Sequence, residues 1–288
     1  MIAGFAITGL RHLVLKKIGI SFFATLLLIG LSSLEFPVAD RAGEQLSPAP
    51  ERDASITWPD RPGFRVDNFN VQRGKGLDDV RDLTRAIEVL KGSELAGLQE
   101  LSGTFFYGWQ DQANQVARAT GLNYLFAPTT YRWLQPNKGS GLLSRFPVNN
   151  WSIERLPEVA DTEANPRNLI RAEMTILGRP VTVLVTHLDR RENNAVQLDY
   201  VLNAFREVEG PVILLGDLNT DNRNDVLMNF IGEPGVVDAV EQSIGPFWRL
   251  DWIITRGFRV IEGGYTPRGI SDHAHYWVQL DFLQENTP

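Results

Sequence analysis

The feature that most constrains the fold is a short apolar run, Val212-Ile-Leu-Leu-Gly216, which stops abruptly at Asp217 and Asn219. Four aliphatic residues in a row are typical of a strand that is buried on both faces. Side chains two residues apart in an extended segment share a face, so we expect Asp217 and Asn219 to emerge together where this strand ends. Asp and Asn also favour tight turns without any function, and the run alone leaves both interpretations open.

The rest of the chain mixes strand-like and helix-like segments. Helical spacing is found at residues 77–90, 107–119 and 195–208. Strands are expected at residues 64–71, 95–98, 123–127, 141–144, 149–153, 169–176, 181–186, 251–255, 258–262 and 274–282. Long apolar strands with hairpins and interspersed helices predict an α/β fold in which helices cover mixed sheets.

The first forty residues differ from the remainder. Arg11, Lys16 and Lys17 precede residues 18–34, which carry no charge. Basic residues before an apolar run favour a cytoplasmic N-terminus and export of the residues after the run. We expect residues 1–39 to be a signal-anchor or signal peptide, with an uncleaved anchor favoured; a buried core helix is the alternative. The domain would then be membrane-anchored outside the cytoplasm, in the periplasm or at the cell surface, or secreted.

Prolines and scattered charges come after this segment. Pro48, Pro50, Pro59 and Pro62 lie in a stretch that is typical of a flexible tether. We therefore expect residues 40–62 to be a linker and residues 63–288 to form one folded domain.

Composition narrows the chemistry. The chain has no cysteine, which excludes disulfides, thiolate nucleophiles and cysteine-bound zinc. Residues 1–39 hold three of the 28 basic and one of the 35 acidic side chains, so the remainder has a net charge of −9. Such a surface is poorly suited to tight, sequence-independent binding of nucleic acid. A small or lipid-borne phosphoester fits this charge better than long duplex DNA.

Polar residues recur at the boundaries of the expected strands. Each has a structural explanation of its own, such as a turn former, a helix-capping acid or a solvated strand edge. Their concentration at strand ends favours a shared site. The residues concerned are Asn70, Glu100, His187, Asp217, Asn219, Asp251, Asp272 and His273.

Seven short motifs occur in a fixed order. They are Asn70, Leu98-Gln99-Glu100, Gly141-Leu-Leu-Ser-Arg145, Thr186-His187-Leu188, Gly216-Asp-Leu-Asn219, Leu250-Asp251-Trp-Ile and Ser271-Asp272-His273. This set resembles the endonuclease/exonuclease/phosphatase superfamily across residues 63–282. The resemblance implies a four-layer sandwich of two mixed β-sheets flanked by α-helices, and a metal-dependent phosphoesterase.

The resemblance also implies roles for single residues. Asn70 and Glu100 would hold Mg²⁺, with Mn²⁺ as an alternative, and Asp272 would join directly or through water. His187, His273 and Asn219 would hold the phosphoryl oxygens, and Arg167 would reach a phosphate. Asp217 would deprotonate the attacking water, and Asp251 would orient His273. His275 lies outside the family pattern and is expected to be structural.

Three functional hypotheses remain open at this point. The first is an exported Mg²⁺-dependent phosphoesterase that hydrolyses a phosphodiester in a lipid, nucleotide or nucleic acid by in-line attack of water. The second is a DNA or RNA nuclease of the same fold. The third is a membrane-tethered binding protein that has lost the chemistry. Residues 18–34 would contact the membrane, and no protein partner is inferred.

Overall fold

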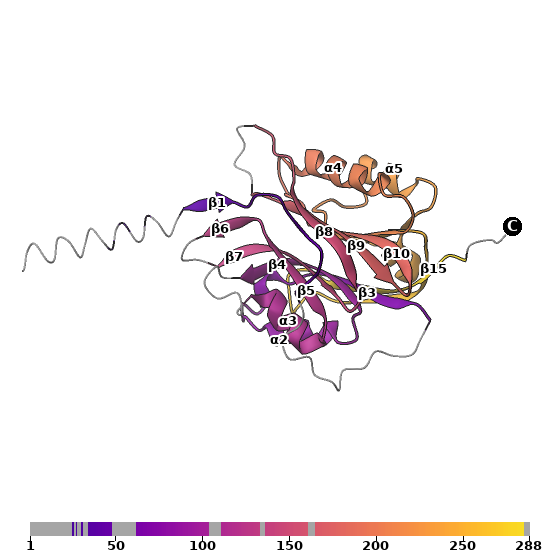
Figure 1. Cartoon of the computed structure of the whole chain (residues 1–288), viewed down its shortest axis with the longest axis horizontal. Helices are drawn as coiled ribbons and strands as arrows, with labels where there is room; N and C mark the ends of the chain where they lie inside the picture. Colours follow the sequence, from indigo (N-terminus) through magenta and orange to yellow (C-terminus); the bar gives the residue numbers. More distant parts are fainter. Residues whose placement is uncertain are drawn as a thin grey trace, which may run out of the picture.

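Four layers make up the domain. The computed structural model describes residues 25, 27, 30, 34–47, 62–103, 111–132, 136–160 and 165–284. Two β-sheets pack face to face, and helices cover the outer face of each sheet (Figure 1). The two mixed sheets with flanking helices confirm the predicted α/β class.

The first sheet has seven strands. In spatial order they are β12 (Val236–Asp238), β13 (Asp251–Arg256), β11 (Val212–Asp217), β10 (Arg179–His187), β9 (Asn168–Ile176), β8 (Val148–Arg155) and β2 (Arg41–Gly43). Strands β10 and β11 run parallel, and the other neighbours are antiparallel. The apolar run at residue 212 is therefore an interior strand, as predicted.

The second sheet has six strands. In spatial order they are β14 (Phe258–Thr266), β15 (His275–Phe282), β3 (Phe64–Asn70), β4 (Leu95–Gly103), β7 (Asn137–Ser144) and β5 (Asn123–Pro128). Strands β3 and β4 are parallel, and the remaining pairs are antiparallel. The carboxyl ends of β3 and β4 thus reach the same edge of this sheet.

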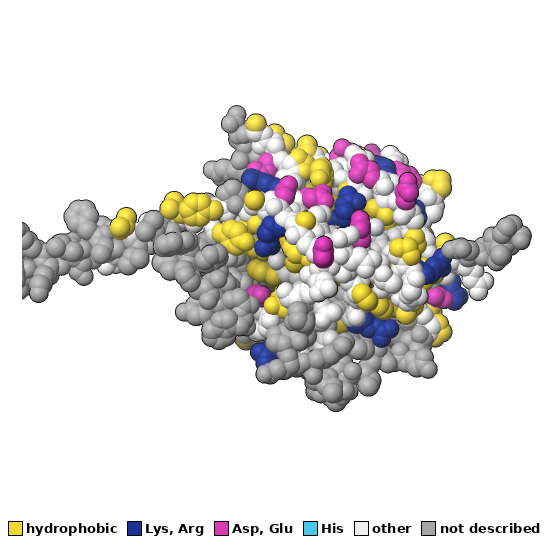
Figure 2. Space-filling model, viewed as in Figure 1, with side chains coloured by type: hydrophobic (Ala, Val, Ile, Leu, Met, Phe, Trp, Pro, Cys, Tyr) yellow, Lys and Arg dark blue, Asp and Glu magenta, His cyan; other side chains and the backbone are white. Residues whose placement is uncertain are grey.

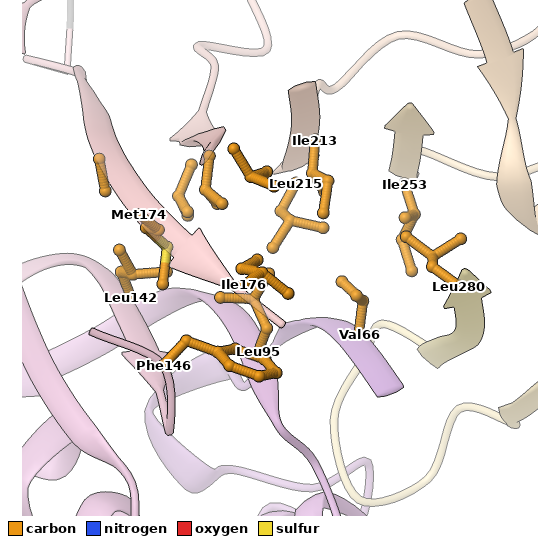
Figure 3. Packing of buried hydrophobic residues seen from close by; sticks show 14 of the residues in the cluster. Val66, Leu95, Leu142, Phe146, Met174, Ile176, Ile213, Leu215, Ile253 and Leu280 are labelled. Carbon is orange, nitrogen blue, oxygen red and sulfur yellow. The ribbon is translucent and has the colours of Figure 1, made fainter. Parts of the chain in front are cut away.

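The main core lies between the sheets. Ile213 and Leu215 of β11 point into it, where they join Val66 and Leu95 of the second sheet (Figure 3). A Cβ atom on Gly97 would lie 2.7 Å from the Cβ atom of Leu215, so the sheets approach closely at a residue that lacks a side chain. Burial of each large aliphatic side chain here contributes about 1.5–3 kcal/mol.

Helices close the two outer faces. On the seven-stranded sheet, α4 (Asn194–Arg206) and α5 (Asp225–Ile231) meet through Phe205 and Phe230, whose ring centroids are 5.1 Å apart. On the six-stranded sheet lie α2 (Leu83–Leu90) and α3 (Gln112–Thr120). Figure 1 shows the two helix pairs on opposite sides of the strands. The short α6 (Ala239–Ile244) packs its first residues against the core between the sheets.

The expected helix at residues 77–90 is shorter than predicted. It begins at Leu83, because Asp82 has extended backbone angles and its side chain accepts a hydrogen bond from the backbone N–H of Thr84. Leu77 and Val80, which contributed to the helical spacing, are exposed. For the expected helix at residues 107–119, residues 104–110 lie outside the described part, and α3 begins at Gln112.

The start of the described chain is folded onto the domain. β1 (Glu35–Pro37) pairs with β6 (Thr130–Arg132), β2 extends the seven-stranded sheet, and Ser47 forms a bridge with Tyr124. The first part of the expected linker is therefore a strand of the sheet instead of a tether, and folded structure begins before Gly63. Residues 48–61 lie outside the described part.

The predicted membrane segment at residues 18–34 also lies outside the described part, apart from residues 25, 27, 30 and 34. Among the residues that the structure describes, no helix has the length and apolar character needed to traverse a bilayer.

Candidate active site

Three predicted residues meet because of strand register. His187 at the end of β10 is paired with Asp217 at the end of β11, and Asp217 is paired with Asp251 at the start of β13. Since β11 and β13 are antiparallel, the end of one strand lies beside the beginning of the other. The three side chains are therefore neighbours on adjacent strands.

The six-stranded sheet brings Asn70 and Glu100 to the same place. The register of β4 against β7 shifts between Leu98 and Leu101, and Glu100 has a φ of 54°. Such a bulge redirects a side chain that a regular strand would point elsewhere. The Asn70 side-chain amide donates to Asp217 Oδ2 at 3.0 Å and to Glu100 Oε1 at 3.4 Å. Asn70 thus joins the two sheets at the site.

His273 precedes β15 and faces two carboxylates. Its Nδ1 atom is 2.8 Å from Asp251 Oδ2, and its Nε2 atom is 3.7 Å from Asp217 Oδ2. Burial by itself would lower the pKa of His273, but the hydrogen bond and charge of Asp251, with the charges of Asp217 and Asp272, raise that pKa to about 9. His273 is therefore an imidazolium near neutral pH, and its Nε2 atom lies on the side of Asp217.

Asp217 is the buried centre of the group. Its Oδ1 atom accepts a hydrogen bond from the backbone N–H of Asn219 at 3.0 Å. Burial and the nearby charge of Asp251 raise the pKa of Asp217 to about 7, although His273 and Asn70 oppose this shift. A carboxyl group with such a pKa can take up and release a proton near neutral pH.

His187 has its tautomer set by Arg167. Arg167 Nη1 lies 3.1 Å from His187 Nδ1, and a guanidinium can only donate, so Nδ1 is the acceptor and Nε2 carries the proton. Burial, followed by the positive charges of Arg167 and His273, lowers the pKa of His187 well below its usual value. The Nε2 atom of this neutral ring lies 3.4 Å from Asp217 Oδ2.

Asp272 is held by a residue that the sequence did not indicate. Gln72 Nε2 donates to Asp272 Oδ2 at 2.8 Å, and the backbone N–H of Gln72 donates to Asn70 Oδ1 at 3.1 Å. Gln72 has a φ of 45°, which is unusual for a residue other than glycine. Ser271 Oγ also donates to the carbonyl of Asn70 at 2.7 Å. The loops that carry Asn70 and Asp272 are thereby joined.

Two asparagines at strand ends have structural contacts. The Asn219 side chain donates to the carbonyl of Leu188 at 2.9 Å, with a φ of 47° at Asn219. Asn168, beside Arg167, donates to the carbonyls of Ala127 and Pro128, each at 3.2 Å. Asn168 therefore connects β9 to the end of β5.

A cavity of about 360 Å³ opens over this group. It is lined by Glu100, Thr129, Thr130, Lys138, Gly139, Ser140, Asn165, Pro166, Arg167, His187, Arg190, Asp217, Asn219, Asp272 and His273. Seven of the nine predicted residues line it, and the other two, Asn70 and Asp251, are buried and bonded to lining residues. Lys138, in β7, and Arg190, in the loop after β10, were missed because an isolated cation carries no sequence signal. Acidic and basic side chains thus share one cavity.

The donor atoms fit a hard divalent cation. Glu100, Asp217 and Asp272 line the cavity with carboxylate oxygens, which are the ligands that Mg²⁺ and Mn²⁺ prefer. Asn70 turns its Nδ2 toward Glu100 and Asp217 and its Oδ1 toward the N–H of Gln72. A second grouping of Asp217, Asp251 and His273 has ligand atoms within 4.8 Å of one another. Because His273 is protonated and donates to Asp251, the oxygen set suits a metal better than this second grouping does.

His275 lies apart from the cavity, as predicted. Its Nε2 atom is 2.7 Å from Asp67 Oδ1, and both side chains are almost fully buried. The ring of Phe69 packs against His275 with centroids 5.4 Å apart. This pair links β3 and β15 of the second sheet.

Comparison with known proteins gives the family. Residues 68–273 match the Endonuclease/Exonuclease/phosphatase family. A search of curated protein sequences finds no match. Members of that family are metal-dependent hydrolases of phosphoester bonds, and the cavity of this chain holds carboxylates and two histidines. The chain belongs to the Endonuclease/Exonuclease/phosphatase family.

Solved structures share the fold at low sequence identity. An endonuclease/exonuclease/phosphatase from Beutenbergia cavernae is 22% identical, with a TM-score of 0.61 over 77% of this chain and 72% of that one. The human Nocturnin catalytic domain with bound sulfate is 19% identical, with a TM-score of 0.58 over 77% and 94% of the chains. A mannosyl-6-phosphatase from Bacteroides thetaiotaomicron is 17% identical, with a TM-score of 0.57 over 76% and 100%.

Proposed function

We propose that the chain is a Mg²⁺-dependent phosphodiesterase that acts by in-line attack of an activated water. The observation that carries this proposal is the convergence of His187 Nε2 and His273 Nε2 on Asp217 Oδ2, at 3.4 Å and 3.7 Å. Two N–H donors and a carboxylate with a pKa of about 7 provide, in one cavity, both phosphoryl binding and a base.

Each residue of the cavity has a separate task. Asp217 accepts a proton from water as the water oxygen attacks phosphorus. His187 and His273 donate to the phosphoryl oxygens, and the positive charge of His273, maintained by Asp251, balances the charge that builds there. Arg167 supports the phosphate from the basic side of the cavity and fixes the tautomer of His187. The amide of Asn219 is bonded to Leu188, so its contribution to phosphate binding would require that bond to exchange.

Asn70 and Glu100 would hold the metal ion, with Asp272 as a direct or water-mediated ligand. A bound Mg²⁺ would supply Lewis-acid stabilisation of the phosphoryl charge. A cation beside Asp217 would also lower the pKa of that carboxyl group, which favours its role as a base. Gln72 would hold Asp272 beside the ion, whereas Asn70 would have to turn its Oδ1 from the N–H of Gln72 toward the ion.

The charge of the chain favours a small or lipid-borne ester as substrate. The net charge of −7 gives little long-range attraction for a polyanion. The basic residues before the apolar run at residues 18–34 support a catalytic domain outside the cytoplasm. Recovery of the full chain in the soluble cytoplasmic fraction after lysis would contradict this location.

The test is hydrolysis of bis-p-nitrophenyl phosphate by the purified chain with Mg²⁺ or Mn²⁺. EDTA and the substitution Glu100→Gln should each reduce turnover by at least about 10²-fold. Glu262→Gln, at an exposed position on β14, is the matched control and should leave turnover unchanged. Turnover that survives both EDTA and Glu100→Gln would contradict the proposed site.

Plasmid DNA and RNA in the same substrate series test the nuclease alternative. Faster cleavage of nucleic acid than of any lipid or small diester would favour that alternative. Metal binding without turnover of any phosphoester would favour the non-catalytic binding protein. The complete set of Glu100, Asp217 and His273 in one cavity argues against this last hypothesis.

A further inference from the structure

The rim of the cavity is joined to the N-terminal segment by a two-stranded ribbon. Glu35, Phe36 and Pro37 of β1 pair with Arg132, Tyr131 and Thr130 of β6. The backbone N–H of Val38 then donates to the carbonyl of Thr129. Thr129 and Thr130 both line the catalytic cavity. Through Thr130, the β1–β6 ribbon is therefore part of the cavity wall.

Residues 34–47 hold this ribbon in place from both sheets. Arg41–Gly43 adds a strand to the seven-stranded sheet, whereas Ser47 forms a bridge with Tyr124 of the six-stranded sheet. The side chain of Asp40 accepts a hydrogen bond from the backbone N–H of Arg155 at 2.8 Å. Because contacts to both sheets fix this segment, the ribbon has little freedom to move relative to the cavity.

The ribbon presents apolar surface at its start. Leu34 and Phe36 are 46% and 50% exposed, and Phe36 is paired with Tyr131. Hydrophobic side chains are visible at the end of the molecule where β1 lies (Figure 2). An aromatic pair next to exposed aliphatic surface is typical of side chains at the headgroup level of a bilayer.

Sequence distance places the cavity rim close to the apolar run. Residues 18–34 contain no charged side chain, and Leu34 directly precedes β1. The three extended residues of β1 span about 10 Å, and the last of them, Pro37, is paired with Thr130. Thr130 therefore lies within about 15 Å of the end of the apolar run. The polar layer on each side of a bilayer is about 5–8 Å thick. If the run is embedded, the cavity rim lies at the headgroups or just above them.

We propose that the β1–β6 ribbon is a bilayer-contact surface, and that the cavity takes the phosphodiester of a membrane lipid headgroup. This inference rests on the proposed phosphodiesterase function. Lys138, Arg167 and Arg190 line the cavity and suit an anionic headgroup. In the reaction a water oxygen bonds to phosphorus, the phosphorus–oxygen bond to one ester alcohol breaks, and that alcohol leaves with a proton.

The first test changes only the distance between the apolar run and the ribbon. A flexible insert of about twenty Gly and Ser residues between Leu34 and Glu35 has a root-mean-square length of about 25 Å. The full chain is reconstituted in vesicles of phosphatidylethanolamine and phosphatidylglycerol, and lipid products are measured by mass spectrometry. We expect the insert to lower lipid turnover about tenfold and to leave bis-p-nitrophenyl phosphate turnover unchanged.

The two turnover rates separate the two claims. If the parent chain turns over neither the lipid nor bis-p-nitrophenyl phosphate, the proposed function is contradicted. Normal turnover of the soluble diester with no lipid product, or lipid turnover that the insert does not change, would overturn the lipid inference while the enzyme remains. Faster cleavage of RNA or DNA than of lipid in the same vesicles would also overturn it.

The second test measures where the ribbon lies. Because the chain has no cysteine, Phe36→Cys provides a single site for a fluorescent label. Leu177→Cys is the control, since the exposed Leu177 lies in the turn between β9 and β10 at the end of these strands away from His187. Lipids that carry a nitroxide should quench the label at residue 36 and not at residue 177. Equal quenching at the two positions would overturn the inference.

Discussion

Two histidines that lie two residues apart form nearly identical hydrogen bonds with different consequences. His273 Nδ1 is 2.8 Å from Asp251, and His275 Nε2 is 2.7 Å from Asp67. The side chain of His273 is 15% exposed and lines the cavity, whereas that of His275 is 1% exposed. A hydrogen bond between a histidine and an aspartate therefore does not identify a catalytic residue.

The neighbours of each pair account for the difference. Asp67 also forms an ion pair with Arg65 at 2.7 Å, so the negative charge beside His275 is already balanced. Asp251 has no such partner among the described ion pairs, and its neighbour Asp217 is a second acid. His273 thus balances two buried carboxylates and keeps Nε2–H directed into the cavity. Access to the cavity and an unbalanced negative charge distinguish the His273–Asp251 pair from the His275–Asp67 pair.

The largest effect is expected on turnover at His273. His273→Ala removes one N–H donor from the phosphoryl site and should lower kcat about 10²–10³-fold. The midpoint of urea unfolding should change little, because this side chain borders a cavity. Measured kcat on bis-p-nitrophenyl phosphate close to that of the parent chain would exclude the proposed role.

His275→Ala should act on stability instead. Removal of this ring leaves Asp67 buried with Arg65 alone and opens a space beside Phe69, at a cost of about 3 kcal/mol. Urea unfolding followed by fluorescence measures this loss. Turnover per folded molecule should stay the same, and a stable variant with little turnover would assign His275 to the chemistry.

Asp217→Asn should separate stability from activity. The pKa of this buried carboxyl rises from 3.8 to about 7 on folding, so the folded state binds an extra proton between these values and loses stability as pH rises through them. An amide does not titrate. In EDTA at pH 8 we expect the variant to be more stable than the parent by on the order of 2 kcal/mol, with turnover abolished. A variant less stable than the parent at every pH would contradict the raised pKa.

Asp251→Asn should move the alkaline limb of the pH dependence of activity. The proposed reaction needs protonated His273, so we expect activity to fall as pH rises through the His273 pKa of about 9. Without Asp251, burial lowers this pKa, and the alkaline limb should move down by at least about one pH unit. Asp67→Asn is the matched control. An unmoved limb in Asp251→Asn, or an equal shift in both variants, would show that Asp251 does not set the charge of His273.

The strand ends were predictable from the sequence because each combines an apolar run with a polar residue directly after it. Asp217 shows this most clearly, and strand register then brings it to His187 and Asp251. Glu100 was also identified, but the bulge that directs it depends on pairing with β7 and has no local signal. The order of the site residues along the chain was therefore predictable, but the orientation of their side chains at the site was not.

Other features depend on partners that are distant in the chain. β1 and β2 have three residues each, and each pairs with a strand about a hundred residues away. The prolines from Pro48 onward predicted a tether that starts at residue 40, but β2 lies within the first part of that range. Gln72 contacts Asp272 across 200 positions, and its positive φ cannot be read from residue type. These contacts are set by tertiary packing.

The most direct measurement is turnover of a phosphodiester in water labelled with heavy oxygen, with Mg²⁺ present. The site predicts that the label enters the phosphoryl product alone, because a water deprotonated by Asp217 attacks phosphorus. It also predicts that incorporation stops in EDTA and in Glu100→Gln. Label in the alcohol product, or incorporation that continues without metal and without the Glu100 carboxylate, would contradict the account.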